Sequence, residues 1–236
     1  ELSDGAYALT VTATDTAGNI SAASSALSIT VDTTAPAAPT FTTADTTTNE
    51  TTPVISGIAE AGSTVELFNG DASLGTTTAD ATTGAYSITT AALDDGDYSL
   101  TVTATDEAGN TSAASDALSI TIDATAPEQP AITTTTTLTN NSTPTIAGTA
   151  EADSTVTLLS SGVAIGTTTA NGDGQFSITT STLADNTYSL TVTATDAAGN
   201  ISDASDALSI TIDATAPGKP SIITTTSLTN DSTPTI

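Results

Sequence analysis

Hydrophobic and polar residues alternate along much of this chain with a period of two. From Tyr98 to Thr105, apolar residues alternate with serine and threonine, and Leu118, Ile120 and Ile122 repeat the same spacing. Successive side chains of a β-strand point to opposite faces, so this pattern predicts strands with one buried and one exposed face. No long segment has the 3.6-residue apolar period of a helix. The sequence therefore predicts an all-β chain.

The alternating segments recur about every 90 residues. Asp15, Asp106 and Asp196 each lie in the sequence Thr-Ala-Thr-Asp-x-Ala-Gly-Asn, at spacings of 91 and 90 residues. This period, filled with short strands, predicts tandem immunoglobulin-like β-sandwiches of about seven strands each, arranged end to end as an elongated rod. In the first full period we place the strands near Phe41 and at residues 53–59, 64–68, 73–79, 85–89, 98–105 and 118–122.

The repeat also predicts the domain boundaries. Residues 1–35 are expected to be the C-terminal part of one repeat, residues 36–126 and 127–216 two complete repeats, and residues 217–236 the N-terminal part of a further one. The natural protein is accordingly expected to continue at both ends. At each boundary the last strand of one repeat is followed by an aspartate, and the next repeat begins at a proline, as in the stretch from Ile122 to Pro127.

Composition removes several classes of function. The chain has 27 acidic residues, one basic residue and a formal net charge of −26, with no histidine and no cysteine. Disulfides, thiolate zinc sites and imidazole catalysis are therefore excluded, and we do not expect an enzyme. The single basic residue, Lys219, leaves no patch for nucleic acid. No apolar run is long enough for direct membrane insertion. The charge instead suits a hard cation that prefers oxygen ligands, above all Ca²⁺.

The carboxylates are expected to meet where one repeat follows another. In a seven-strand sandwich the incoming linker lies beside the loops after the second and the sixth strand. Three carboxylates about 5 Å apart would repel by about 3 kcal/mol per pair at an effective dielectric of 20, and only a cation would offset this. The candidate calcium ligands are Asp32, Glu60, Asp106 and Asn110 at one joint, Asp123, Glu151, Asp196 and Asn200 at the next, and Asp15 and Asp213 at the joints that involve the incomplete flanking repeats.

Two other interpretations of acidic residues remain open. Asp106 and Asn110 also suit a tight turn, although turn chemistry accounts for neither the linker aspartate nor Glu60. Asp95, with its counterparts Asp4 and Asp185, precedes a tyrosine in a segment that resembles the tyrosine corner of immunoglobulin-like sandwiches. These three aspartates either cap that corner or add ligands at the following joint.

The sequence Tyr-Ser-Leu-Thr-Val-Thr-Ala-Thr-Asp-x-Ala-Gly-Asn, followed by Ser-Ile-Thr-Ile-Asp-x-Thr-Ala-Pro, resembles the bacterial immunoglobulin-like (BIg) tandem repeats of giant type I-secreted (RTX-type) surface adhesins. The resemblance implies an extracellular, bacterial cell-surface location and tandem domains rigidified by Ca²⁺ at their junctions. It implies a structural extender that projects a distal binding region for cell adhesion or biofilm formation. Its partners would be neighbouring repeats of the same chain.

Two alternatives belong to other functional classes. A self-assembling extracellular matrix fibre would need exposed strand edges that pair between chains, with lateral or homotypic association in a biofilm. An ice- or glycan-binding module would use rows of threonine hydroxyls such as Thr101–Thr105 and Thr133–Thr137. Threonine at outward strand positions is, however, explained by strand propensity alone.

Overall fold

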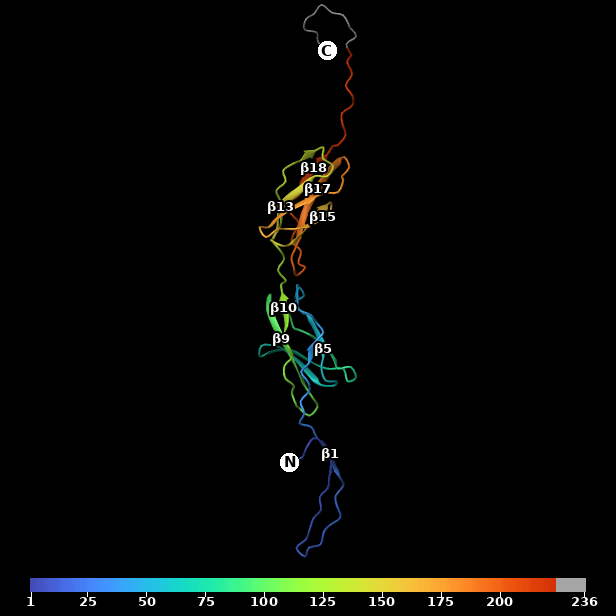
Figure 1. Cartoon of the computed structure of the whole chain (residues 1–236), viewed down its shortest axis with the longest axis vertical. Helices are drawn as coiled ribbons and strands as arrows, with labels where there is room; N and C mark the ends of the chain where they lie inside the picture. Colours follow the sequence, from blue (N-terminus) through green and yellow to red (C-terminus); the bar gives the residue numbers. More distant parts are fainter. Residues whose placement is uncertain (224–236) are drawn as a thin grey trace, which may run out of the picture. The chain divides into compact units, whose positions relative to one another are not determined.

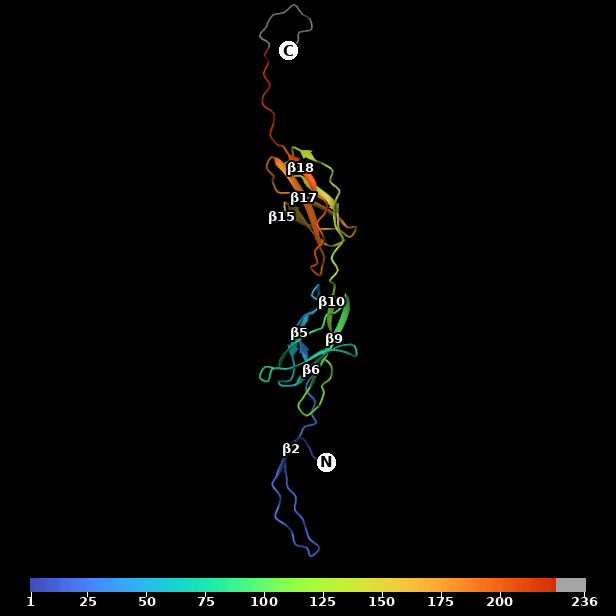
Figure 2. The ribbon, with the colours of Figure 1, turned by 180° about the vertical axis from the view of Figure 1, so that it is seen from behind.

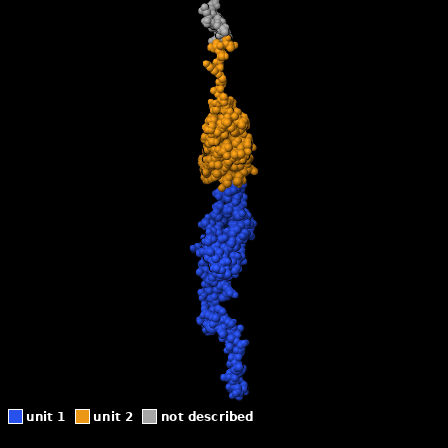
Figure 3. Space-filling view, turned by 90° about the vertical axis from the view of Figure 1, so that its right-hand side faces the viewer, with its two compact units in different colours: residues 1–126, 197–200 blue, residues 127–196, 201–236 orange. Residues whose placement is uncertain are grey.

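The protein is an all-β molecule in the computed structural model, which describes residues 1–223 (Figure 1). In that range the chain forms eighteen strands, and no helix is long and apolar enough to cross a membrane. The chain forms two compact units, which have different colours in Figure 3. Unit 1 contains residues 1–126 and 197–200, and unit 2 contains residues 127–196 and the chain from residue 201 onward.

Two sheets form the sandwich of unit 1. The three-stranded sheet has the order β3-β5-β8 and the five-stranded sheet the order β4-β10-β9-β6-β7. All pairs are antiparallel except β4 with β10, which is parallel. The strands are β3 (Thr40–Phe41), β4 (Thr46–Thr48), β5 (Val54–Ile58), β6 (Thr64–Asn69), β7 (Ala72–Thr78), β8 (Ala85–Thr89), β9 (Gly96–Thr105) and β10 (Leu118–Ile122).

The core of unit 1 lies between these sheets. Ile55 and Ile88 from the smaller sheet pack in one cluster with Leu67, Leu100 and Ile120 from the larger one, and all five are at most 3% exposed. This is the face that the period-two pattern predicts to be buried, and the tandem β-sandwich prediction is confirmed. A tight turn joins β6 to β7 through residues 70 and 71, with Gly70 at a φ of 58°.

The first strand differs from the prediction. One strand was expected near Phe41, whereas the chain pairs as β3 with β5 and then changes sheet to pair as β4 with β10. The three threonines of β4 carry no apolar alternation, which is why the sequence pattern missed this strand.

Unit 2 repeats the arrangement, with sheets β11-β13-β16 and β12-β18-β17-β14-β15. Residues 133–137 connect β11 to β12 without forming a strand, so the threonines there do not form the regular row of hydroxyls that an ice- or glycan-binding module would use. The strands are β11 (Ala131–Ile132), β12 (Leu138–Thr139), β13 (Thr145–Thr149), β14 (Thr155–Ser160), β15 (Val163–Thr169), β16 (Gln175–Thr179), β17 (Asn186–Thr195) and β18 (Leu208–Ile212).

A hairpin precedes the sandwich of unit 1. It pairs β1 (Gly5–Leu9) with β2 (Leu27–Val31), the counterparts of β9 and β10 (Figure 2). Without an opposing sheet its apolar residues are exposed: Leu9 is 41% exposed, whereas its counterpart Leu100 is 0% exposed. The segment that we assign to a further repeat, residues 217–236, lies partly outside the described residues.

Serine side chains complete the pairing of β9 where β10 has not yet begun. Ser112 Oγ accepts from the backbone N–H of Ala104 and donates to the carbonyl of Ala113. Ser115 Oγ likewise accepts from the backbone N–H of Val102 and donates to the carbonyl of Asp116. Hydroxyls thus replace strand hydrogen bonds over residues 112–117. This pairing anchors the loop that carries Asp106 to the end of β9.

Candidate metal centre

The two ends of each repeat carry different groups of carboxylates. We call the end that receives the preceding linker the N-terminal pole; in unit 1 it comprises Asp32 and the loops at residues 60–63 and 106–110. We call the opposite end the C-terminal pole, which comprises residues 94–98 and 122–125. The sequence predicts a metal centre at the N-terminal pole.

A pocket of about 520 Å³ opens at the N-terminal pole of unit 1. Its walls include Asp32 from the linker, Glu60 from the loop between β5 and β6, and Asp106 from the loop after β9. These are the three carboxylates that the sequence predicts to converge. Ser63 and Glu107 also line the pocket.

Local hydrogen bonds hold both loops in place. Ser63 donates from Oγ and from its backbone N–H to the carbonyl of Glu60, at 2.7 and 3.1 Å, which closes a tight turn. In the other loop Asp106 Oδ1 accepts from the backbone N–H of Asn110, and Asp106 Oδ2 accepts from Asn110 Nδ2, both at 2.8 Å. The Asn110 side chain is the main reason that the pKa of Asp106 lies below its ordinary value.

The same asparagine also holds the linker. Asn110 Nδ2 donates to the backbone carbonyl of Asp32 at 3.1 Å. The loop at residues 197–200 belongs to unit 1, and there Asn200 Nδ2 donates to the carbonyl of Asp123 at 2.7 Å. The amide of each asparagine therefore ties a loop to a linker. Ligation of a metal by Asn110 or Asn200 stays a prediction.

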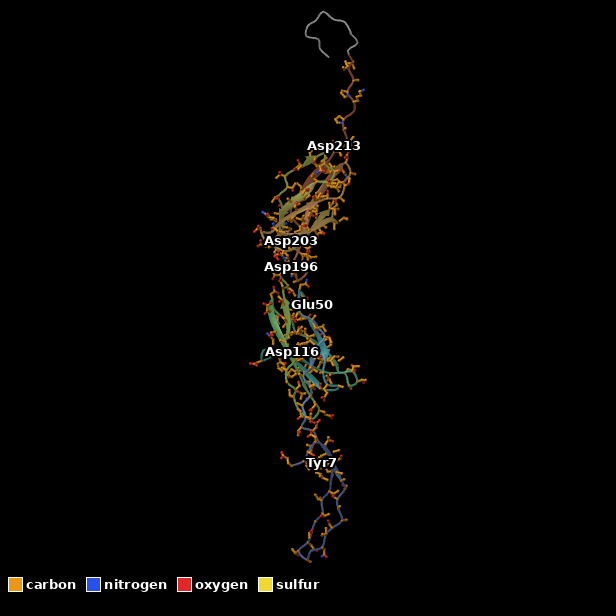
Figure 4. All side chains as sticks on the ribbon, in the orientation of Figure 1. Tyr7, Glu50, Asp116, Asp196, Asp203 and Asp213 are labelled. Atoms are coloured by element: carbon orange, nitrogen blue, oxygen red, sulfur yellow. The ribbon has the colours of Figure 1, made fainter. Side chains whose placement is uncertain are left out.

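The carboxylates of the linker aspartates make local turns. Asp32 Oδ1 accepts from the backbone N–H of Thr34 at 3.0 Å, and Asp123 Oδ1 accepts from Thr125 at 3.1 Å. Asp213, labelled in Figure 4, accepts from Thr215 at 3.3 Å. Such turns fix the side chain to its own backbone. Each carboxylate still has a second oxygen and further lone pairs.

The remaining predicted ligands lie apart from this pocket or in the other unit. Asp15 lies in the loop of the first hairpin, where Oδ2 accepts from Asn19 Nδ2 at 2.8 Å and the pKa of Asp15 is lowered by that contact. Glu151 and Asp196 belong to unit 2. The Glu151 carbonyl accepts from Ser154 Oγ at 2.7 Å, the same turn as at Glu60.

The residues at the pocket suit a hard cation by their chemistry. The carboxylate and carbonyl groups named above are oxygen donors, which Ca²⁺ prefers, and Lys219 is the chain's only basic side chain. Over residues 1–223, however, no three acidic groups are already close enough together to hold a metal ion. The pocket therefore has the donor set of a calcium site in an open arrangement.

A family model for the bacterial Ig-like domain matches residues 1–33, 38–124 and 126–214. The chain belongs to the bacterial Ig-like domain family. Its matched segments succeed one another almost without a gap, so these Ig-like domains are in tandem. No curated protein matches the chain.

Several solved structures resemble these Ig-like domains. The fibronectin(III)-like modules of Clostridium thermocellum CbhA match at 20% identity and a TM-score of 0.49, over 74% of this chain and 93% of that one. The BSP domain of a biofilm associated protein matches at 26% identity and a TM-score of 0.31, over 76% of this chain and 30% of that one. The D0-D1 domain of intimin matches at 13% identity and a TM-score of 0.25, over 72% of this chain and 98% of that one.

Sequence reasoning missed one acidic residue of the pocket in the first complete Ig-like domain. Glu107 occupies the variable position of Asp-x-Ala-Gly-Asn, where the other two copies have Thr16 and Ala197. Because only one copy is acidic, the comparison of repeats that identified Asp106 could not identify Glu107. The signal available was its position directly after Asp106.

At the C-terminal pole of the same Ig-like domain, both carboxylate oxygens of Asp95 accept hydrogen bonds. Asp95 Oδ1 accepts from the backbone N–H of Ala124 at 2.9 Å, and Asp95 Oδ2 accepts from Thr125 Oγ1 at 2.6 Å. The Thr125 hydroxyl is the main cause that lowers the pKa of Asp95. Tyr98 OH donates to the carbonyl of Asp94 at 2.9 Å, which confirms the tyrosine corner. Asp95 thus holds the linker, a role that the sequence analysis did not consider.

Proposed function

We propose that this chain is an extender segment of a bacterial cell-surface adhesin, in which Ca²⁺ bound at the N-terminal pole of each Ig-like domain stiffens the joint with the domain before it. The segment would hold a distal binding region away from the cell for adhesion or biofilm formation. Membership of a bacterial Ig-like family and the tandem arrangement support this role.

The observation that carries the proposal is the pocket lined by Asp32, Glu60 and Asp106. One of these residues comes from the linker and two come from loops of the following domain, so a shared ion would connect the linker to both loops. Calcium takes six to eight oxygen ligands in flexible geometries, which suits a pocket that must close around the ion. Glu107 would add a further carboxylate.

Removing calcium would leave these carboxylates with no counter-charge. Uncompensated carboxylates repel one another, and the repulsion favours a more open and mobile joint. Bound calcium stabilises the folded domain by mass action, because the unfolded chain does not hold the ligands together. The mechanism is therefore mechanical and requires no chemical reaction.

Small-angle scattering on the 236-residue chain tests the proposal. We expect a larger maximum dimension and a narrower range of conformations in calcium than in chelator, because bound ions stiffen the joints. The double substitution Asp32→Ala and Asp123→Ala should give the chelator profile in both solutions. Asp71→Ala, in the turn between β6 and β7, is the matched control and should keep the calcium response. Identical profiles for the unsubstituted chain in calcium and chelator would reject the proposed stiffening.

A self-assembling fibre is the second candidate. It requires open strand edges, and β7 and β15 are edge strands of their sheets. Both are paired through a register shift, between Leu67 and Phe68 and between Leu158 and Leu159. Bulges of this kind twist an edge away from regular pairing with another chain. The bulges thus protect one edge of each five-stranded sheet, whereas β8 and β16 are regular edge strands of the three-stranded sheets.

A further inference from the structure

The aspartate before each tyrosine corner contacts the linker in the same way in three places. Asp95 binds Ala124 N–H and Thr125 Oγ1, as described above. Asp185 accepts from the N–H of Ala214 at 2.8 Å and from Thr215 Oγ1. Asp4 accepts from the N–H of Thr33 at 3.0 Å and from Thr34 Oγ1 at 2.8 Å. In every copy one carboxylate oxygen takes a backbone donor and the other takes a threonine hydroxyl.

The contact does not depend on a complete sandwich. Asp4 lies in the first hairpin, where the apolar face is exposed, yet it binds its linker as Asp95 and Asp185 do. Asp4 directly precedes β1, and its neighbour Gly5 pairs with Val31 at the end of β2. The contact is therefore specified locally, by the aspartate, the two strand ends and the Thr residue of the linker.

The neighbouring backbone donors of the linker are also bound. Asp123 N–H donates to the carbonyl of Thr48 at 3.0 Å, and Thr125 N–H donates to Asp123 Oδ1. With Ala124 N–H bound to Asp95, three successive N–H groups have acceptors. The prolines that follow, Pro127 here and Pro217 in the next copy, have a fixed φ and no N–H. Few backbone rotations remain free between the last strand and the proline.

We propose that Asp4, Asp95 and Asp185 are clamps that fix each linker to the domain before it, whether or not a metal is bound. The linker is then a rigid extension of the preceding domain, and it presents the linker aspartate in a constant orientation. Because the clamp carboxylates are satisfied by N–H and O–H donors, the clamp needs no cation. This proposal goes beyond the proposed calcium binding and is independent of it.

Amide hydrogen exchange of Ala124 in the full chain tests the clamp, measured by NMR in chelator and in calcium. Ala124 is exposed, so its protection depends on the bond to Asp95. We expect protection in both solutions. Asp95→Ala should speed exchange of Ala124 by about ten- to a hundred-fold, the range expected for losing one hydrogen bond to a charged acceptor. Thr125→Val, which removes only the hydroxyl, should speed it by less.

Asp94→Ala is the matched control. The Asp94 carboxylate makes no hydrogen bond to any residue of the described chain, and its backbone carbonyl still accepts from Tyr98. Exchange of Ala124 should stay as in the unsubstituted chain, and unchanged amides in β9 and β10 would report intact folding of every variant. Unprotected Ala124 in chelator, or exchange unaffected by Asp95→Ala, would overturn the clamp. Protection that appears only with calcium would also overturn it while leaving the calcium proposal standing.

Discussion

The two poles of the domain at residues 36–126 use the same kind of side chain in opposite ways. At the C-terminal pole both oxygens of Asp95 accept hydrogen bonds from donors in the linker. At the N-terminal pole Asp32, Glu60 and Asp106 line an open pocket together with a further glutamate, Glu107. Asp106 also accepts on both oxygens, from Asn110, but it shares its pocket with three other carboxylates, and several carboxylates around one pocket favour a cation. The difference predicts that calcium acts on one pole only.

The largest effect should come from neutralising the N-terminal pole. In the unsubstituted chain, calcium at about 100 times its Kd should stabilise the domain by about 2.7 kcal/mol. For a domain of this size that raises the Tm by roughly 10–20 °C. Glu60→Gln combined with Asp106→Asn should remove most of that gain, and in chelator the relief of repulsion is opposed by the loss of the Asn110 Nδ2 bond to Asp106 Oδ2, so the Tm there should change little. Differential scanning calorimetry with and without calcium measures both quantities.

The matched change at the other pole is Asp94→Asn combined with Asp95→Asn. It also removes two negative charges, but neither residue lines the pocket, so the calcium-dependent gain in Tm should be unchanged. An equal loss of the calcium response from both poles would show that the response reflects total charge and not a site. The comparison between the poles would then fail.

The tyrosine corner should give a smaller effect that is independent of calcium. Tyr98→Phe removes the hydrogen bond to Asp94 and should cost about 0.5–1.5 kcal/mol, equal in calcium and chelator. Tyr86→Phe is the control: Tyr86 OH donates to the carbonyl of Thr40 at 3.2 Å, but the second domain has Phe176 at this position. We therefore expect a smaller loss there. Chemical denaturation of the three proteins tests the order.

Replacing a buried hydroxyl directly after β8 should give a gain in stability. Thr90 is 4% exposed, and its Oγ1 has no hydrogen-bond partner in residues 1–223; the same is true of Thr180 in the second domain. Replacing a buried unpaired hydroxyl by a methyl group of the same shape removes a desolvation cost, so Thr90→Val should stabilise the domain by up to about 1 kcal/mol. Denaturant midpoints measure this change. A loss of stability would indicate that the hydroxyl has a bound water.

Alternation and periodicity predicted most of the fold because the core requires both. Fully buried residues in the strands are two positions apart, as with Val65 and Leu67 or Leu100 and Val102. Burial therefore produces an alternation of apolar and polar residues that can be recognised in the sequence. The switch of the first strand between sheets produces no such alternation, because β4 consists of three threonines near the surface. Residues 133–137 show the reverse case, since a run of threonines there forms no strand.

The candidate site was predictable only where the repeats agree. Asp32, Glu60 and Asp106 recur with the period, and topology predicted that they lie together; they line one pocket, and their binding of a metal stays a prediction. The role of Asp95 was not predictable from spacing, because its partners Ala124 and Thr125 lie 29 and 30 residues further along the chain and one of them is a backbone N–H. A backbone donor has no signature in the sequence. The recurring threonine of the linker was the one available sign.

The smallest expected effect is a shift in the titration of single carboxyl groups, and it separates the poles most directly. The pKa values of Asp95 and Asp106 both lie below the ordinary value, mainly because of Thr125 and Asn110 respectively. Each contact therefore stabilises the fold at pH values above the ordinary carboxyl pKa of about 4, and its contribution is lost as the pH falls through the lowered value. Thr125→Val and Asn110→Ala should each raise the pKa of the partner carboxyl toward the ordinary value.

Calcium should act on only one of these two groups. A bound divalent cation favours the ionised form of a nearby carboxyl, so it should lower the pKa of Asp106 further and leave that of Asp95 unchanged. Carbon-detected NMR of the side-chain carboxyl signals, recorded over a pH series with calcium and with chelator, measures both values in one sample. Equal shifts at Asp95 and Asp106 would mean that the ion acts through the overall charge of the chain. A shift at Asp106 alone would place the ion at the pole that receives the linker.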